Sequence, residues 1–154
     1  MTYSKPVLTS AEIARLTVAY QQAIYEAYID GERIDLSIGE YNCKLNQLLK
    51  KHHCQTWALI TAANPYSQPL SETENQQRHQ KLIEATKPDR LITYAAIGKD
   101  KTGAWTPETS LLILGIDRAG AIALGNLFEQ NAIVWGTLDT PPELLWLNKS
   151  RSRL

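Results

Sequence analysis

Cysteine is scarce in this sequence, neither charge is in excess, and no long apolar run occurs; each scarcity excludes a class of protein. Two cysteines among 154 residues are too few for a disulfide framework. The 16 basic and 16 acidic side chains cancel, so no net charge attracts the chain to nucleic acid or to an anionic membrane. No apolar run approaches the roughly 18 residues of a membrane-spanning helix, and the N-terminus lacks the apolar core of a signal peptide. We therefore expect a cytoplasmic protein that binds neither nucleic acid nor membranes.

Motifs for catalysis and metal binding are scarce as well. The sequence contains no glycine-rich phosphate loop and no Gly-x-Ser-x-Gly motif. Cys43, His52, His53 and Cys54 are metal-ligand types, but their spacing matches no zinc pattern. The two cysteines would lie roughly 16 Å apart on one short helix, too far to share an ion. The sequence therefore predicts no metal, no cofactor and no catalytic residue, and it favours a protein that is not an enzyme.

What is present is an alternation of helical and strand patterns in a chain long enough for one domain with a sizeable core. Capping boxes and helical periodicity predict helices at 10–22, 41–53, 72–86 and 118–129. Apolar and alternating runs predict strands at 23–29, 32–38, 55–62, 90–97, 110–116 and 132–135.

These elements predict an α/β (α+β) fold in a single domain spanning residues 1–154. The first two strands, joined by Asp30-Gly31, form one hairpin, and 90–97 with 110–116 forms another. Strands joined through helices favour parallel neighbours, so we expect a mixed sheet of about six strands packed against four helices. The apolar piece at 144–146 is expected to pack back on this body, and residues 1–8 and 148–154 to be loose arms.

The stretch from Trp57 to Arg78 is the most informative part of the chain. An apolar strand ends at Asn64-Pro65, a polar loop follows, and a helix begins at the capping box that opens with Ser71. Proteins of the α/β class usually place their sites where a strand gives way to a loop and a helix. We therefore expect the functional site around this loop.

Further motifs accompany this stretch. They are W-A-x-I-T-A-x-N-P at 57–65, N-x-x-R at 75–78, glycine at 98, W-x-P-E-x-S at 105–110, L-G-I at 114–116 and Q-N-A-I-V at 130–134. In this combination the chain resembles, over most of its length, a bacterial family of small stand-alone cytoplasmic proteins known as domain of unknown function 3293. The resemblance implies candidate positions and no reaction. Tyr66 stands where a small residue such as glycine is usual in the family, which implies a bulkier loop.

The polar and aromatic residues of these motifs form the candidate binding site. They are Asn64, Pro65, Asn75, Arg78, Trp105, Glu108, Ser110, Gln130 and Asn131. Each has a structural alternative: Asn64-Pro65 as a turn, and Gln130-Asn131 as a helix cap. Arg78 either pairs with Glu108 as an internal clamp or holds an anion. A neighbouring arginine would lower the pKa of Glu108, which suits a clamp better than a general acid. We expect Asn64, Arg78, Glu108 and Gln130 to converge on one rim of the sheet.

Two functions remain. The sequence favours a non-catalytic interaction, accessory or assembly factor that binds a partner protein through a sheet edge or the helix–loop rim. Four tryptophans and seven tyrosines support it, because these residues are favoured at binding surfaces. The alternative is a small anionic-ligand binding protein or enzyme with a polar site around Asn64, Arg78 and Glu108. An enclosed pocket faced by both Arg78 and Glu108 would favour this alternative.

Overall fold

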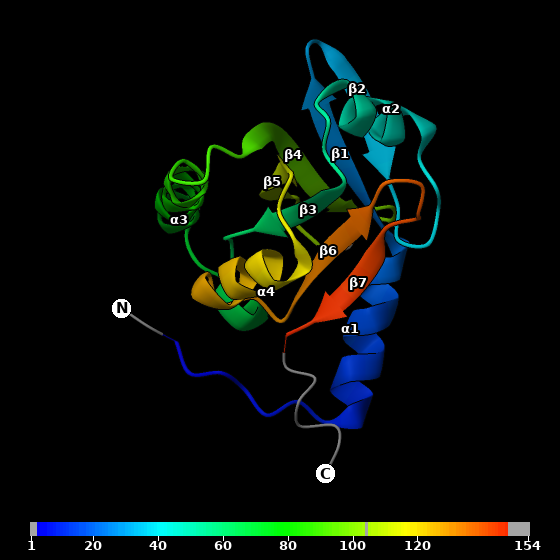
Figure 1. Ribbon diagram of the computed structural model, residues 1–154. Helices are drawn as coiled ribbons and strands as arrows, with labels where there is room; N and C mark the ends of the chain where they lie inside the picture. The colour runs from blue at the N-terminus through cyan, green and yellow to red at the C-terminus, as the bar shows by residue number, and fades with distance from the viewer. Residues whose placement is uncertain (1–2, 104, 148–154) are drawn as a thin grey trace.

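The computed structural model describes residues 3–103 and 105–147, and within them seven strands form one curled sheet (Figure 1). The strand order is β2-β1-β4-β5-β3-β6-β7. The strands are β1 (Ala23–Ile29), β2 (Glu32–Leu36), β3 (Thr56–Thr61), β4 (Ile92–Asp100), β5 (Glu108–Leu114), β6 (Ala132–Thr137) and β7 (Glu143–Trp146). The helices are α1 (Ser10–Gln22), α2 (Cys43–Lys51), α3 (Glu72–Thr86) and α4 (Arg118–Leu127), with a short 3-10 turn, η1 (Pro65–Ser67).

The predicted α/β (α+β) fold with four helices and two hairpins is confirmed. Two details of the predicted sheet are wrong. There are seven strands rather than six, because the apolar piece at the end of the described chain pairs with β6 as β7. The described strands form no parallel pair, so the sheet is antiparallel rather than mixed.

The helical crossovers explain the second difference. The crossover through α3 joins β3 to β4, which run in the same direction, but β5 lies between them and runs the opposite way. The crossover through α4 likewise joins β5 to β6 across β3. Helices therefore link strands of equal direction, as expected, yet each crossover skips one position that an antiparallel strand fills.

Local sequence signals set the helix boundaries. Thr9 and Ser71 form the two predicted capping boxes, each accepting a hydrogen bond from the backbone of the glutamate three residues later. Asp117 caps α4 by accepting from the N–H of Gly120 at 2.7 Å. Asn42 caps α2, whose predicted range of 41–53 shortens to Cys43–Lys51.

The two faces of the sheet are covered differently. On one face, Leu82 of α3 with Ala121 and Leu124 of α4 packs on strand residues that include Ile60 and Ile113. On the other face, α2 packs its three leucines, Leu45, Leu48 and Leu49, against a cluster around Trp57. The remaining part of that second face lies beneath α1, which runs alongside β7 (Figure 1).

Several predictions about the rest of the chain can be compared with the structure. Cys43 and Cys54 are both free thiols. The N-terminal stretch from residue 3 makes contacts with the body: the N–H of Tyr3 donates to Glu129, and the ammonium of Lys5 donates to the carbonyl of Leu147. The prediction for 148–154 lies outside the described residues. Within residues 3–103 and 105–147, no helix has both the length and the apolar character that crossing a membrane requires.

Candidate functional site

A cavity of about 500 Å³ lies on the sheet face that α2 covers only in part, beneath α1. Its floor includes Tyr25 of β1, Leu59 of β3 and Val134 of β6, which belong to the same core cluster as the α2 leucines. Its walls come from the loop after β3 and from the loop before β5, and α1 lies over it. The loop that the sequence singles out therefore does border a cavity, and the cavity is mostly apolar.

The α1 helix forms the roof of this cavity. Leu16, Ala19 and Tyr20 line it, and their spacing of three and four residues places them on one face of the helix. The ring of Tyr20 also meets that of Trp146 edge-on, with centroids 5.8 Å apart, which fixes α1 against β7. No residue of α1 is fully buried, so the helix is attached to the body by one partly exposed face.

Glu108 brings the only carboxyl group among the described residues that line the cavity. It is the first residue of β5 and lies opposite Gly98 of β4. Its Oε2 accepts a hydrogen bond from the side-chain amide of Asn64 at 2.8 Å. Desolvation by burial raises the pKa of Glu108, and the Asn64 hydrogen bond opposes that shift only in part.

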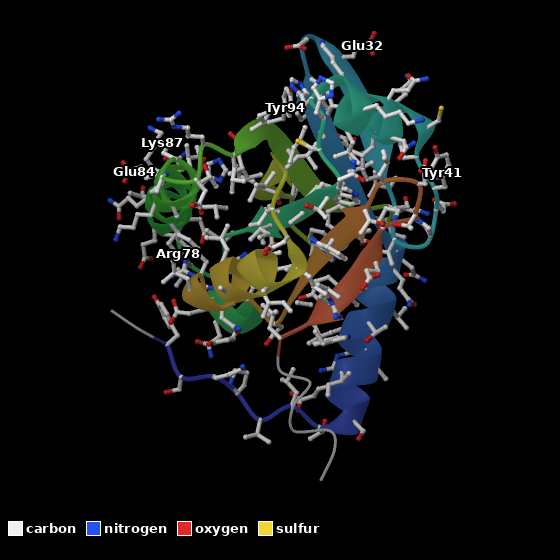
Figure 2. All side chains as sticks on the ribbon, in the orientation of Figure 1. Glu32, Tyr41, Arg78, Glu84, Lys87 and Tyr94 are labelled. Atoms are coloured by element: carbon white, nitrogen blue, oxygen red, sulfur yellow. The ribbon has the colours of Figure 1, made fainter. Side chains whose placement is uncertain are left out.

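The structure contradicts the pairing of Glu108 with Arg78. The guanidinium of Arg78 donates to Glu129 Oε1 at 3.1 Å, to the carbonyl of Phe128 at 2.6 Å and to the carbonyl of Ala62 at 2.5 Å. Both partners of the ion pair are largely buried, with 16% and 13% of their side chains exposed. Figure 2 shows Arg78 between the ribbons of α3 and α4. Arg78 is thus an internal clamp, but its carboxylate comes from the end of α4 rather than from the strand β5.

Asn64 connects the cavity to the start of α3. Its Oδ1 accepts from the N–H of Leu70 at 3.0 Å and from the side-chain amide of Asn75 at 2.9 Å, while its own N–H donates to Asn75 Oδ1 at 3.0 Å. Its side-chain amide nitrogen donates to Glu108. Asn75 therefore holds Asn64 in place from behind, and Asn64 in turn orients the carboxyl group.

The loop that carries Asn64 has an unusual backbone. Asn64, Tyr66 and Ser67 all have positive φ, at 50°, 50° and 64°. This region is strained for residues with a side chain, and such strain concentrates at functional sites. Pro65, buried between them, fixes one φ angle and begins the 3-10 turn.

The other predicted site residues divide between the cavity and the surrounding scaffold. Trp105, Ser110 and Gln130 line the cavity. The Gln130 amide also donates to the carbonyls of Ala63 and Phe128, both at 3.1 Å, so it ties the loop to the end of α4. Asn131 does not line the cavity, but its side-chain amide donates to Oγ of Ser67, which does. Of the four polar groups expected to converge, Asn64, Glu108 and Gln130 do so at the cavity. Arg78 does not line the cavity and contacts the end of α4 instead.

Tyr20 and Tyr25 are cavity residues that the sequence does not single out. Burial raises the pKa of both hydroxyls, and the nearby charge of Glu108 raises it further. Gly98 makes room for Tyr25, because a Cβ at position 98 would lie 3.2 Å from the tyrosine ring. An aromatic residue on an amphipathic helix or strand looks like core in a sequence, so nothing local marks these two as lining a cavity.

The lining residues limit the chemistry of the site. Among the residues that the structure describes, no lysine, arginine or histidine lines the cavity, and no cluster of three histidine, cysteine or acidic side chains is placed to hold a metal. Hydroxyl and amide groups are supplied by residues such as Thr61, Ser67 and Gln130. The arrangement suits recognition of a mostly apolar molecule through a few polar contacts.

Comparison with known proteins finds a family model that matches the central part of this chain. The model of the family described as a protein of unknown function (DUF3293) matches residues 60–133. This match confirms the resemblance to that family over the matched residues. The DUF3293 segment begins within β3, ends within β6 and contains Asn64, Glu108 and Gln130, whereas the α1 roof and Tyr25 lie before it. No curated protein and no solved structure matches the chain.

Proposed function

We propose that this protein binds a small, largely apolar organic molecule in the cavity beneath α1. The observation that carries the proposal is a cavity of about 500 Å³ in which one desolvated carboxyl group faces an otherwise mostly apolar and aromatic lining. That volume lies in the range of small-molecule sites, which are typically apolar with a few placed polar groups. Protein cores are normally filled by side chains, and this space is not. The unfilled cavity therefore supports the binding of a ligand.

Two features of the scaffold support the same proposal. The polar group in the cavity is held by a chain of hydrogen bonds from Asn75 through Asn64 to Glu108. Such support keeps a binding group in one orientation before the ligand arrives, which lowers the cost of binding. The α1 roof is attached without a fully buried residue, so it can open for entry with little loss of packing.

The anionic ligand suggested by the sequence is not part of this proposal. It relies on Arg78, which does not line the cavity and whose three guanidinium nitrogens each donate to a scaffold group, in Ala62, Glu129 and Phe128. Binding of a partner protein and a cytoplasmic location stay predictions. The β2 edge strand carries the charged side chains Glu32, Arg33 and Asp35, which discourage pairing with another strand.

Titration with prodan, a neutral naphthalene dye that emits at shorter wavelength in apolar surroundings, tests the proposal. We expect saturable binding to the wild-type protein and its loss in Ala19→Trp, in which a large side chain enters the cavity from α1. The matched control is Ala123→Trp on the exposed face of α4, which should bind like wild type. Equal binding by all three proteins, or no saturable binding by the wild type, would refute a ligand site here.

A further inference from the structure

The charge balance of the cavity is one-sided. Glu108 supplies a carboxyl group, and the described lining residues supply no cationic side chain to balance it. Arg78, the cation that the sequence suggested as the partner of Glu108, pairs with Glu129 instead. A desolvated carboxylate without a cation is costly, so the site gains most from a ligand that brings a positive charge.

The hydrogen bonds of Glu108 leave one oxygen available. Oε2 accepts from Asn64, whereas Oε1 has no hydrogen-bond partner in the parts of the chain that the structure describes. Asn64 is itself fixed by Leu70 and Asn75, so the carboxyl group has a defined orientation. The free oxygen is therefore a ready acceptor for an N–H group of a ligand.

Aromatic rings complete the surroundings of this carboxyl group. Tyr20 and Tyr25 lie close enough for the charge of Glu108 to influence their hydroxyls, and Trp105 lines the same cavity. Tyrosine and tryptophan faces attract cations, most strongly where water is excluded. A carboxylate and aromatic rings lining one cavity are a combination suited to an ammonium group joined to an apolar body.

Resting on the function proposed above, we infer that the ligand is an organic ammonium ion. Its protonated amine donates to Glu108 Oε1 and lies beside the rings of Tyr20 and Trp105. Its apolar body occupies the part of the cavity lined by residues such as Leu16, Leu59 and Val134. Neutral and anionic molecules of the same shape cannot form an ion pair with Glu108. The charge of the ligand therefore decides which molecules bind tightly.

Three probes of similar shape test this inference by displacement of prodan: 3-phenylpropylamine, the neutral 3-phenylpropan-1-ol and the anionic 3-phenylpropanoate. We expect the amine to bind the wild type at least roughly tenfold more tightly than the alcohol does, and the carboxylate to bind most weakly. Glu108→Gln, which keeps the shape of the side chain, should abolish the preference for the amine while prodan still binds. The control Glu143→Gln removes an exposed carboxylate of β7 outside the cavity lining and should keep the preference.

The outcomes separate this inference from the proposed function. If prodan binds in the cavity but the alcohol displaces it as well as the amine does, the site binds ligands and the ammonium preference is wrong. If prodan shows no saturable binding, both the proposed function and the ammonium preference are wrong.

A measurement on the wild type alone covers the case in which Glu108→Gln does not fold. Calorimetry in two buffers of different ionisation heat should show proton release when the amine binds at a pH where Glu108 is protonated. Absence of proton release would contradict an ion pair with Glu108.

Discussion

At the residue scale, the contrast between Glu108 and Glu129 explains how the site differs from its scaffold. Glu129 meets a guanidinium and a backbone N–H, so its charge is matched inside the protein. Glu108 meets a single amide and a cavity, and desolvation raises its pKa. The matched carboxylate holds elements together, and the unmatched one is available to a ligand.

The raised pKa of Glu108 predicts a pH effect on stability. The folded state binds the Glu108 proton more tightly than the unfolded chain does, in which the pKa of a glutamate is near 4.5. This contribution to stability is therefore complete below the unfolded pKa and is lost as the pH rises through the folded pKa. Relative to Glu108→Gln, the wild type should lose stability over that window, as measured by urea unfolding at a series of pH values. Parallel pH profiles of the two proteins would show that the carboxyl group is not desolvated.

Removing the clamp should cost far more than removing an ordinary surface charge. Arg78→Ala leaves Glu129 buried without a cation and removes one donor from each of the carbonyls of Ala62 and Phe128, which should lower the free energy of unfolding by about 3–5 kcal/mol. Arg78→Lys should recover only part of this loss, because an ammonium cannot replace the planar fork. Lys81→Ala, at an exposed position of the same helix, should stay within about 0.5 kcal/mol of wild type in the same denaturant experiment. An equally small effect at Arg78 would contradict the clamp.

Tyr66 occupies a position where the backbone favours glycine. Its φ of 50° and ψ of 36° are left-handed, which costs a residue with a Cβ about 1–2 kcal/mol. Tyr66→Gly removes that strain, whereas Tyr66→Ala keeps it and loses the same ring. The glycine variant should therefore melt at a higher temperature than the alanine variant. A reversed order would mean that the backbone at this position differs from the one described.

At the element scale, α1 is the least firmly held helix of the structure. Its residues include none that is fully buried, whereas α2, α3 and α4 each bury at least two. Local contacts, including the capping box at Thr9, therefore contribute a large part of its stability. Because α1 roofs the cavity, its opening and the entry of a ligand are linked.

Hydrogen exchange measures this linkage. The amides of α1 should exchange faster than those of β3 and β5 at the centre of the sheet, and bound 3-phenylpropylamine should slow them. Thr9→Ala, which removes the cap at a cost of about 1 kcal/mol, should speed exchange in α1 while leaving the sheet unchanged. Uniform exchange rates across α1 and the sheet would show that α1 opens only with global unfolding.

The capped helix starts and the first hairpin turn were the parts of the fold best predicted from sequence, because capping boxes and the Asp-Gly turn are local signals. Thr9 and Ser71 mark the starts of α1 and α3, and Asp30-Gly31 marks the first hairpin turn. The strand order was not predicted, because it depends on pairing between segments that are distant in the sequence. No local pattern indicates that β5 lies between β3 and β4, or that β3 lies between β5 and β6. The strand β7 was missed because its four residues follow a proline pair and carry little pattern of their own.

The candidate site was predictable to a similar extent. Asn64, Glu108 and Gln130 each stand near an element end in a polar motif, and they do meet at the cavity. The predicted pairing of Arg78 with Glu108 was wrong, because the choice between Glu108 and Glu129 depends on how the end of α4 packs against the loop after β3. Tyr20 went unnoticed because an aromatic residue on an amphipathic helix has the same pattern whether it fills a core or lines a cavity.

At the scale of the whole molecule, the sheet divides the structure into a filled side and a partly open side. Two helices cover one face, and their side chains form a continuous core with it. On the other face α2 fills one part, and the remaining part stays hollow beneath α1. The clamp of Arg78 and Glu129 joins the loop to α4 and so secures the cavity wall from the filled side.

This division predicts where a ligand perturbs the protein. In ¹H–¹⁵N spectra, 3-phenylpropylamine should shift the amides of residues 16–20, 64, 66–67 and 108–110, which border the cavity, and leave the exposed face of α4 unchanged. Shifts confined to those segments, saturating with concentration, are the result we expect. Shifts centred on α4, or none at a concentration that saturates prodan displacement, would contradict a ligand site beneath α1.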